Sequence, residues 1–136
     1  MSDITVTAAS VTPGSGATVT NGTAGAAITA GQTVYLDAST NTVKLADCDL
    51  SAAAATVTGI ALHAAASGQP IAYQTSGIIN IGATVVAGKV YVNSATAGGI
   101  APVADLTTNW RTSVLGVALT SSTINLKIDN TGVANA

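Results

Sequence analysis

The stretch AGQTVYLD at Ala30–Asp37 recurs as AGKVYVN at Ala87–Asn93, and this recurrence decides how the chain is expected to fold. A second stretch, TVTGIALHA at Thr56–Ala64, recurs as SVLGVALTS at Ser113–Ser121, in the same order and at the same offset of 56 to 57 residues. Two strand units that cannot each bury an apolar face alone can bury it against each other. The sequence therefore predicts an internal repeat.

A third match lies between these stretches. LADCD at Leu45–Asp49 parallels VADLT at Val103–Thr107, so each unit contains a strand that follows a glycine, a hairpin, an Ala-Asp turn and a second strand. We expect the two units to span about 31–81 and 88–129.

The apolar stretches are short and rich in Val, Ile and Thr, and turn-forming residues interrupt them, which is typical of an all-β protein. Strands are expected at 4–8, 33–37, 43–46, 56–64, 71–75, 78–81, 89–93, 113–120 and 123–129. Asp37–Asn41 and Ser94–Gly99 have the composition of hairpin turns. Gly59 and Gly116 occupy matching positions, where a missing side chain permits a bulge or a close crossing. The expected fold is a small antiparallel barrel or sandwich built from the two repeated units.

Alternation along the second matched strand indicates which side chains are buried. Ile60 and Leu62 alternate with small or polar residues, and Val117 and Leu119 do the same in the other unit. We expect these four side chains to face a shared core.

The composition leaves few residues for chemistry. Charged residues make up 7% of the 136 residues and the net charge is −2, and each neutralised phosphate of a nucleic acid needs its own Lys or Arg. Nucleic-acid binding is therefore not expected. The uncharged stretches are broken by Gly, Pro, Asn and Gln, so no membrane-spanning helix is expected. The start, MSDITVTAAS, lacks the pattern of a secretory signal, which favours synthesis in the cytoplasm.

The first thirty residues differ from the rest. They contain one charged residue, no aromatic side chain and a break at Pro13–Gly16, so they lack the side chains to build a core. We expect 1–30 to be an extended N-terminal arm and 31–136 to be a single β domain. Such an arm pairs onto an open sheet edge or stays loose until a partner offers one; a frayed terminus is the alternative.

Isolated reactive residues favour structural roles. His63 is the only histidine, and its counterpart in the second unit is Thr120, so a structural or surface role is favoured over acid-base catalysis. Cys48 is the only cysteine and no neighbouring His or Lys would lower its pKa, so we expect a small apolar residue.

Three aspartates lie close together in the first unit. Asp37, Asp47 and Asp49 could converge on a hard cation, but Asp is also what tight turns use, and turn chemistry is favoured. We therefore expect no catalytic residue, no metal and no cofactor. Trp110 and Arg111 stand alone in the second unit, and they are either the plug of the barrel end or an interface anchor.

Two long segments and a closing one are similar to a known family. They are AGQTVYLDASTNTVKLADCDLSAAAATVTGIALHAAASGQPIAYQTSG, AGKVYVNSATAGGIAPVADL and SVLGVALTSSTINLKI. These segments resemble the small capsid decoration (cement) and head-fibre-base proteins of tailed bacteriophages. The resemblance covers roughly residues 28 to 129 and depends on the order of GQxVYLD, ADxDxxAAA, TGIAL, GQPIxxQTSG and LGVA.

This resemblance implies a structural virion protein, not an enzyme. Such a module binds the outer surface of the phage capsid, where it bridges and stabilises neighbouring copies of the major capsid protein. It implies a homo-oligomer, with a trimer favoured over a dimer, and the arm would be the clamp. The hypothesised partner-binding residues are Ile4, Val6, Val11, Val19, Trp110 and Arg111. The alternative is the base domain of a head fibre or of a host-recognition adhesin.

Overall fold

The fold is all-β, as predicted, and antiparallel. We describe it from a computed structural model, which describes residues 6–7, 10–37, 39–47, 56–94, 98–102 and 111–134. Within these ranges the chain forms strands joined by turns and bends, without an α-helix. The strands are β1 (Val11–Pro13), β2 (Thr18–Thr23), β3 (Thr33–Asp37), β4 (Thr42–Leu45), β5 (Gly59–Ala61), β6 (Pro70–Ile81), β7 (Val90–Asn93), β8 (Ile100–Pro102), β9 (Arg111–Ala118) and β10 (Thr123–Ala134).

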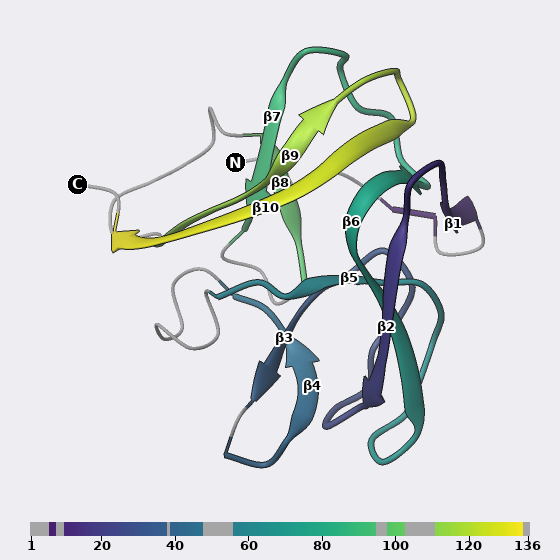
Figure 1. The fold of residues 1–136 in the computed structure, drawn as a ribbon, viewed down its shortest axis with the longest axis vertical. Helices are drawn as coiled ribbons and strands as arrows, with labels where there is room; N and C mark the ends of the chain where they lie inside the picture. Colours follow the sequence, from purple (N-terminus) through teal and green to yellow (C-terminus); the bar gives the residue numbers. More distant parts are fainter. Residues whose placement is uncertain are drawn as a thin grey trace.

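One curled sheet contains all of the strands. Its order is β4-β3-β5-β6-β10-β9-β7-β8, and β1 and β2 pair with β6 as well. The long strand β6 is therefore common to both halves of the sheet, with β2 to β5 around its first part and the hairpin of β9 and β10 beside its second part (Figure 1). The curvature gives the sheet the shape of a half-barrel.

Most expected strands are present, but several bounds differ. The strand expected at 33–37 coincides with β3, whereas the one expected at 56–64 is reduced to β5. The two expected at 71–75 and 78–81 are one continuous strand, β6. The strands β1, β2 and β8 were not predicted, and most of 4–8 lies outside the described residues.

The strands form two units with the same pairing scheme. We call β3 to β6 the first unit, with order β4-β3-β5-β6, and β7 to β10 the second unit, with order β8-β7-β9-β10. Thr33 lies opposite Ile60, and Val90 lies opposite Val117, so both partners are displaced by 57 positions (33 to 90 and 60 to 117). The β3–β4 and β7–β8 hairpins are related by the same displacement.

Hydrogen bonds at the start of each unit are also equivalent. The Gly31 N–H donates to the Ala61 carbonyl at 2.8 Å, and the Gly88 N–H donates to the Ala118 carbonyl at 2.8 Å. The two glycines have φ angles of 86° and 87°, in the left-handed region. The same main-chain arrangement therefore occurs twice in the described residues.

Gly59 and Gly116 lie at close main-chain approaches. A Cβ atom at Gly59 would lie 2.5 Å from the Gln74 carbonyl oxygen, and one at Gly116 would collide with the Asn125 carbonyl oxygen. Any side chain would push the neighbouring strand away, because the obstructing atom is main chain. The expected close crossing is present in both units.

Two apolar clusters lie on opposite sides of the first unit. The main core contains residues of both units: Val11, Ala30, Ala46, Val57, Ile60, Ile79, Ile81, Val85, Tyr91, Ile100, Leu115, Ala118, Ile124 and Leu126. The small core contains Ala24, Ile28, Val34, Val43, Ala61, Ala65, Ile71 and Tyr73. In β5, Ile60 belongs to the main core and the next residue, Ala61, belongs to the small core, as the alternation of a strand requires.

The small core is enclosed because the chain after β2 returns to β4. Ala24 bridges Val43 in parallel orientation, and the Gly25 N–H donates to the Val43 carbonyl at 2.8 Å. The strands β4, β3, β5, β6 and β2 therefore surround the small core.

A bulge in β6 lets one strand contribute to both cores. Ile71 and Tyr73 belong to the small core, but Ile79 belongs to the main core although it is also odd-numbered. Opposite β2, the pairing skips one residue between Gln74 and Ser76, and such an extra residue exchanges the two faces of a strand. The two ends of β6 can thus face different interiors.

The described part of the N-terminal segment is integrated into the sheet and both cores. Val11 is buried in the main core, and Ala24 and Ile28 are buried in the small core. The expectation of an arm separate from the core is therefore wrong for these residues, because they pack into cores that are built mainly by later strands. Pairing onto a sheet edge, the first alternative given for the arm, does occur, and the edge belongs to β6.

The expected orientation of the second matched strand is also wrong. Ile60 is buried and Leu62 packs against the main core, but Val117 and Leu119 are exposed and Ala118 is buried instead. The physical reason is that the second unit turns its opposite face toward the main core.

Polar contacts join the two units near the β7–β8 hairpin. The Thr33 hydroxyl donates to Asn93 Oδ1 at 2.9 Å, and both side chains are fully buried. The Thr33 N–H donates to the Gly98 carbonyl at 3.1 Å, and the Gly98 N–H donates to the Ala46 carbonyl at 2.7 Å. These contacts fix the second unit against one face of the first.

Candidate interaction surfaces

Both ring nitrogens of His63 are occupied by the main chain. Nε2 accepts a hydrogen bond from the Ala72 N–H at 3.0 Å, so the ring proton is on Nδ1, which donates to the Ala64 carbonyl at 2.9 Å. The imidazole thus holds the connection between β5 and β6. These two hydrogen bonds give His63 a structural role, which is the role that the sequence favours.

Asp37 organises the turn between β3 and β4. Its Oδ1 accepts hydrogen bonds from the Ser39 N–H at 3.0 Å and the Ser39 hydroxyl at 2.6 Å, and its Oδ2 accepts one from Lys44 Nζ at 2.8 Å. The Lys44 hydrogen bond, with those from Ser39, holds the pKa of Asp37 below its ordinary value of 3.8. In turn, Asp37 raises the pKa of Lys44. The carboxylate is therefore engaged in turn chemistry.

The alternative of a cation site finds no support in the described residues. Within them, no three His, Cys, Asp or Glu side chains converge. Asp47 is half-buried, and Cys48 and Asp49 lie outside the described residues.

Among the ranges that the structure covers, no helix has the length and apolar character needed to cross a membrane.

The six predicted partner-binding residues have different positions. Val19 in β2 is 43% exposed, whereas Val11 is buried and Val6 packs against the main core. Arg111 is the first residue of β9, and Ile4 and Trp110 lie outside the described residues. Of the predicted residues whose side chains are described, Val19 is the one placed to contact a partner.

The outer edge of β2 is the first candidate surface. Ala72 is the register partner of Asn21, and its main-chain groups point toward β5: its N–H donates to His63 Nε2 and its carbonyl accepts from the Leu62 N–H. In an antiparallel ladder, both residues of such a pair point their main-chain groups outward, so those of Asn21 point away from β6. No described residue binds them. The strand also lacks the charges and prolines that protect many sheet edges.

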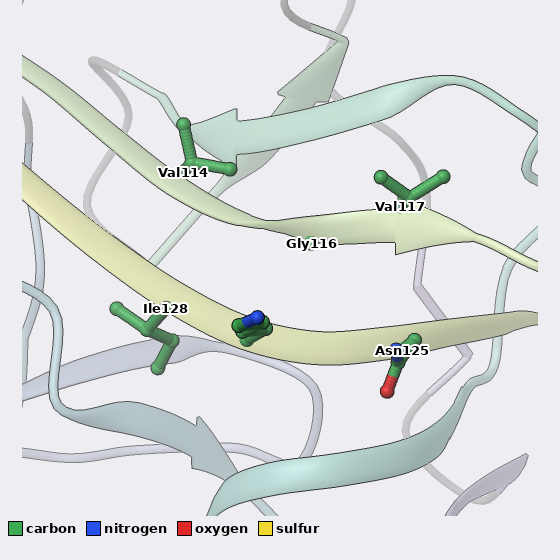
Figure 2. A pocket seen from close by; sticks show the side chains of 6 residues that line it. Val114, Gly116, Val117, Asn125 and Ile128 are labelled. Atoms are coloured by element: carbon green, nitrogen blue, oxygen red, sulfur yellow. The ribbon is translucent and has the colours of Figure 1, made fainter.

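The outer face of β9 and β10 is the second candidate surface. A hollow of about 400 Å³ lies there, lined by Val114, Gly116, Val117, Asn125, Lys127 and Ile128. Figure 2 shows the labelled side chains of Val114, Val117, Asn125 and Ile128 on the two strands. Val117 is 40% exposed, and Leu119, at the end of the same hairpin, is 48% exposed. The sequence pattern missed this surface because it assigned Val117 and Leu119 to the core.

Comparisons with known proteins add no relative. Neither a scan against protein-family models nor a search of curated proteins finds a match to this chain.

Proposed function

We propose that this chain is a structural protein that binds the outer surface of a phage capsid and bridges neighbouring coat subunits. The sequence resemblance suggests this class. The observation on the structure that carries the proposal is the uncharged outer edge of β2, which no described residue pairs and which offers main-chain groups to an extended segment of a coat subunit.

The mechanism is mechanical. A coat segment that adds to β2 gains main-chain hydrogen bonds, and Val19 beside it offers an apolar contact. Each copy contributes little, but many copies on one particle act together, so expansion of the capsid must break many contacts.

A single substitution tests the β2 edge. Deletion of the whole N-terminal segment is unsuitable, because it would remove Ala24 and Ile28 from the small core. Asn21→Pro instead removes one outward N–H, and proline is tolerated on an edge strand where the N–H faces solvent. We expect Asn21→Pro to bind phage heads that lack this protein roughly tenfold or more weakly, while Asn21→Ala, which keeps the N–H, binds like the unmodified chain.

The outcome for particles completes the test. Heads loaded with the unmodified chain should resist heat and low salt better than bare heads. Equal resistance would contradict the proposal. Binding to host cells rather than to heads would favour the adhesin alternative.

A further inference from the structure

His63 takes the place of a main-chain acceptor in the hairpin that joins β5 to β6. The Leu62 N–H donates to the Ala72 carbonyl at 3.0 Å, as in an antiparallel pair. In a regular pair the Ala72 N–H would donate back to the Leu62 carbonyl, but here it donates to His63 Nε2, also at 3.0 Å. The imidazole therefore accepts one of the two hydrogen bonds that close this pair.

The second unit closes its own hairpin in the same way, with a hydroxyl. The Leu119 N–H donates to the Thr123 carbonyl at 3.0 Å, and Leu119 matches Leu62 in the repeat. The Thr123 N–H donates to Thr120 Oγ1 at 3.2 Å, and Thr120 matches His63. A side chain thus accepts the returning N–H in both units, but of these two side chains only an imidazole gains a proton between about pH 8 and pH 5.

Protonation of the ring removes this acceptor. In neutral His63 the proton is on Nδ1, which donates to the Ala64 carbonyl at 2.9 Å, so a second proton binds at Nε2. Both nitrogens of an imidazolium are donors, and the Nε2 proton would then face the Ala72 N–H. The hydrogen bond is therefore present while the ring is neutral, and it is lost as the pH falls through the range in which histidine takes up a proton.

Among the described elements packed on this hairpin, no charged group is placed to pair with a protonated imidazole. Residues 18–30, which bind β6 and the connection before it, contain no titratable side chain. Across 56–76, the other titratable side chain is Tyr73, and burial raises its pKa, so it stays neutral. Asp37 and Lys44 pair with each other at the end of β3 that lies away from β5. A new positive charge on the ring would therefore find no carboxylate.

The connection between β5 and β6 holds down the chain that covers the small core. The Ile28 N–H and the Ala65 N–H each donate to the carbonyl of the other residue at 2.9 Å. The Gly68 N–H donates to the Ala24 carbonyl at 2.7 Å, and the Ala24 N–H donates to the Gln69 carbonyl at 2.8 Å. Because Ala24 and Ile28 are buried in the small core, a change in this connection reaches the core.

We propose that His63 is a pH-sensitive latch, which holds the connection at 62–72 closed while its ring is neutral and releases the connection when the ring is protonated. Release loosens the attachment of residues 24–28 and opens the small core on that side. The strand β2 ends directly before this segment, so its Thr23 end is loosened as well. Thr120 keeps the hairpin of the second unit closed over the same pH range. This proposal does not depend on binding to a capsid.

Hydrogen exchange of individual main-chain amides tests the latch. The protection factor of an amide is the exchange rate of an unstructured chain divided by the observed rate at the same pH. From about pH 7.5 to about pH 5, the protection factor of the Ala72 amide should fall about tenfold or more. Those of Ala65 and Ile28 should fall with it. The Thr123 amide should keep its protection, because its acceptor does not titrate in this range.

Two substitutions of His63 separate the latch from a general effect of acid. His63→Gln provides a side-chain oxygen that accepts a hydrogen bond but does not titrate, so the Ala72 amide should be equally protected at both pH values. His63→Leu has no acceptor, so this protection should be low at both. Equal protection of Ala72 at both pH values in the unmodified chain overturns the proposal, as does an equal fall in His63→Gln. If His63→Leu does not fold, the comparison of the unmodified chain with His63→Gln still decides.

Discussion

The two units of this protein share a strand arrangement but differ in what covers them. Ile60 and Val117 occupy equivalent ladder positions, and each precedes an alanine that points to the opposite side. Ile60 is inaccessible to solvent, whereas Val117 is 40% exposed. Local sequence thus sets the pairing of the strands, but the packing of one unit on the other decides which face is buried.

The largest expected effect is the difference in stability lost when these two side chains are truncated. Ile60→Ala should lower the free energy of unfolding by about 2 to 5 kcal/mol, because it leaves a cavity in the main core. Val117→Ala should cost less than about 1 kcal/mol at protein concentrations where the chain is monomeric, because its side chain is already partly hydrated. Urea unfolding followed by circular dichroism measures both. Equal losses would mean that the two faces are equally buried in solution.

A smaller difference in stability is expected when the glycines that begin the two units are each replaced by alanine. Gly31→Ala and Gly88→Ala both force a side chain into a left-handed conformation, at about 1 kcal/mol each. A Cβ atom at Gly31 would also collide with Val6 and press on Val11, whereas the space around Gly88 is open. Gly31→Ala should therefore cost about 1 to 3 kcal/mol more than Gly88→Ala. Similar thermal stabilities of the two variants would show that the N-terminal segment does not pack on Gly31.

The smallest expected effect is a pH dependence of stability that comes from the β3–β4 hairpin. The folded-state pKa of Asp37 lies below its ordinary value of 3.8, so its contribution to stability is complete above that pH and is lost as the pH falls further. The stability difference between the unmodified chain and Asp37→Asn should accordingly shrink as the pH falls from 5 to 2. In a chain that carries Lys44→Met, the effect of Asp37→Asn on stability should already be smaller at pH 5. Thermal unfolding at a series of pH values provides the measurement. A difference that does not change with pH would remove Asp37 as its cause.

The sequence predicted the features that depend on neighbouring residues. The strand at Thr33–Asp37, the turn that Asp37 organises and the close approaches at Gly59 and Gly116 follow from local composition and from the matched stretches. Each of these needs only a few residues in the right order. The structural role of His63 was also predictable, because its match in the other unit is not a histidine.

Features that depend on distant partners were not predictable. Ser76 and Gly77 lie between the two strands expected at 71–75 and 78–81, yet Gly77, with a φ of 90°, continues β6 beside the bulge. The strand β2 has no apolar run of its own and forms because β6 offers an edge. The exposure of Val117 depends on which face of β9 the first unit covers, and the residue pattern of β9 does not indicate which face that is.

The bulge in β6 places one extra residue, Thr75, in the middle of this strand. Removal of Thr75 would restore strict alternation and still leave Ile71 and Tyr73 facing the small core and Ile79 and Ile81 facing the main core, because an odd separation puts two residues of a strand on opposite faces. Loss of this one residue should accordingly be tolerated better than its place inside a strand suggests, as should loss of a residue at the turn around Ser67 and Gly68, where the residues are exposed.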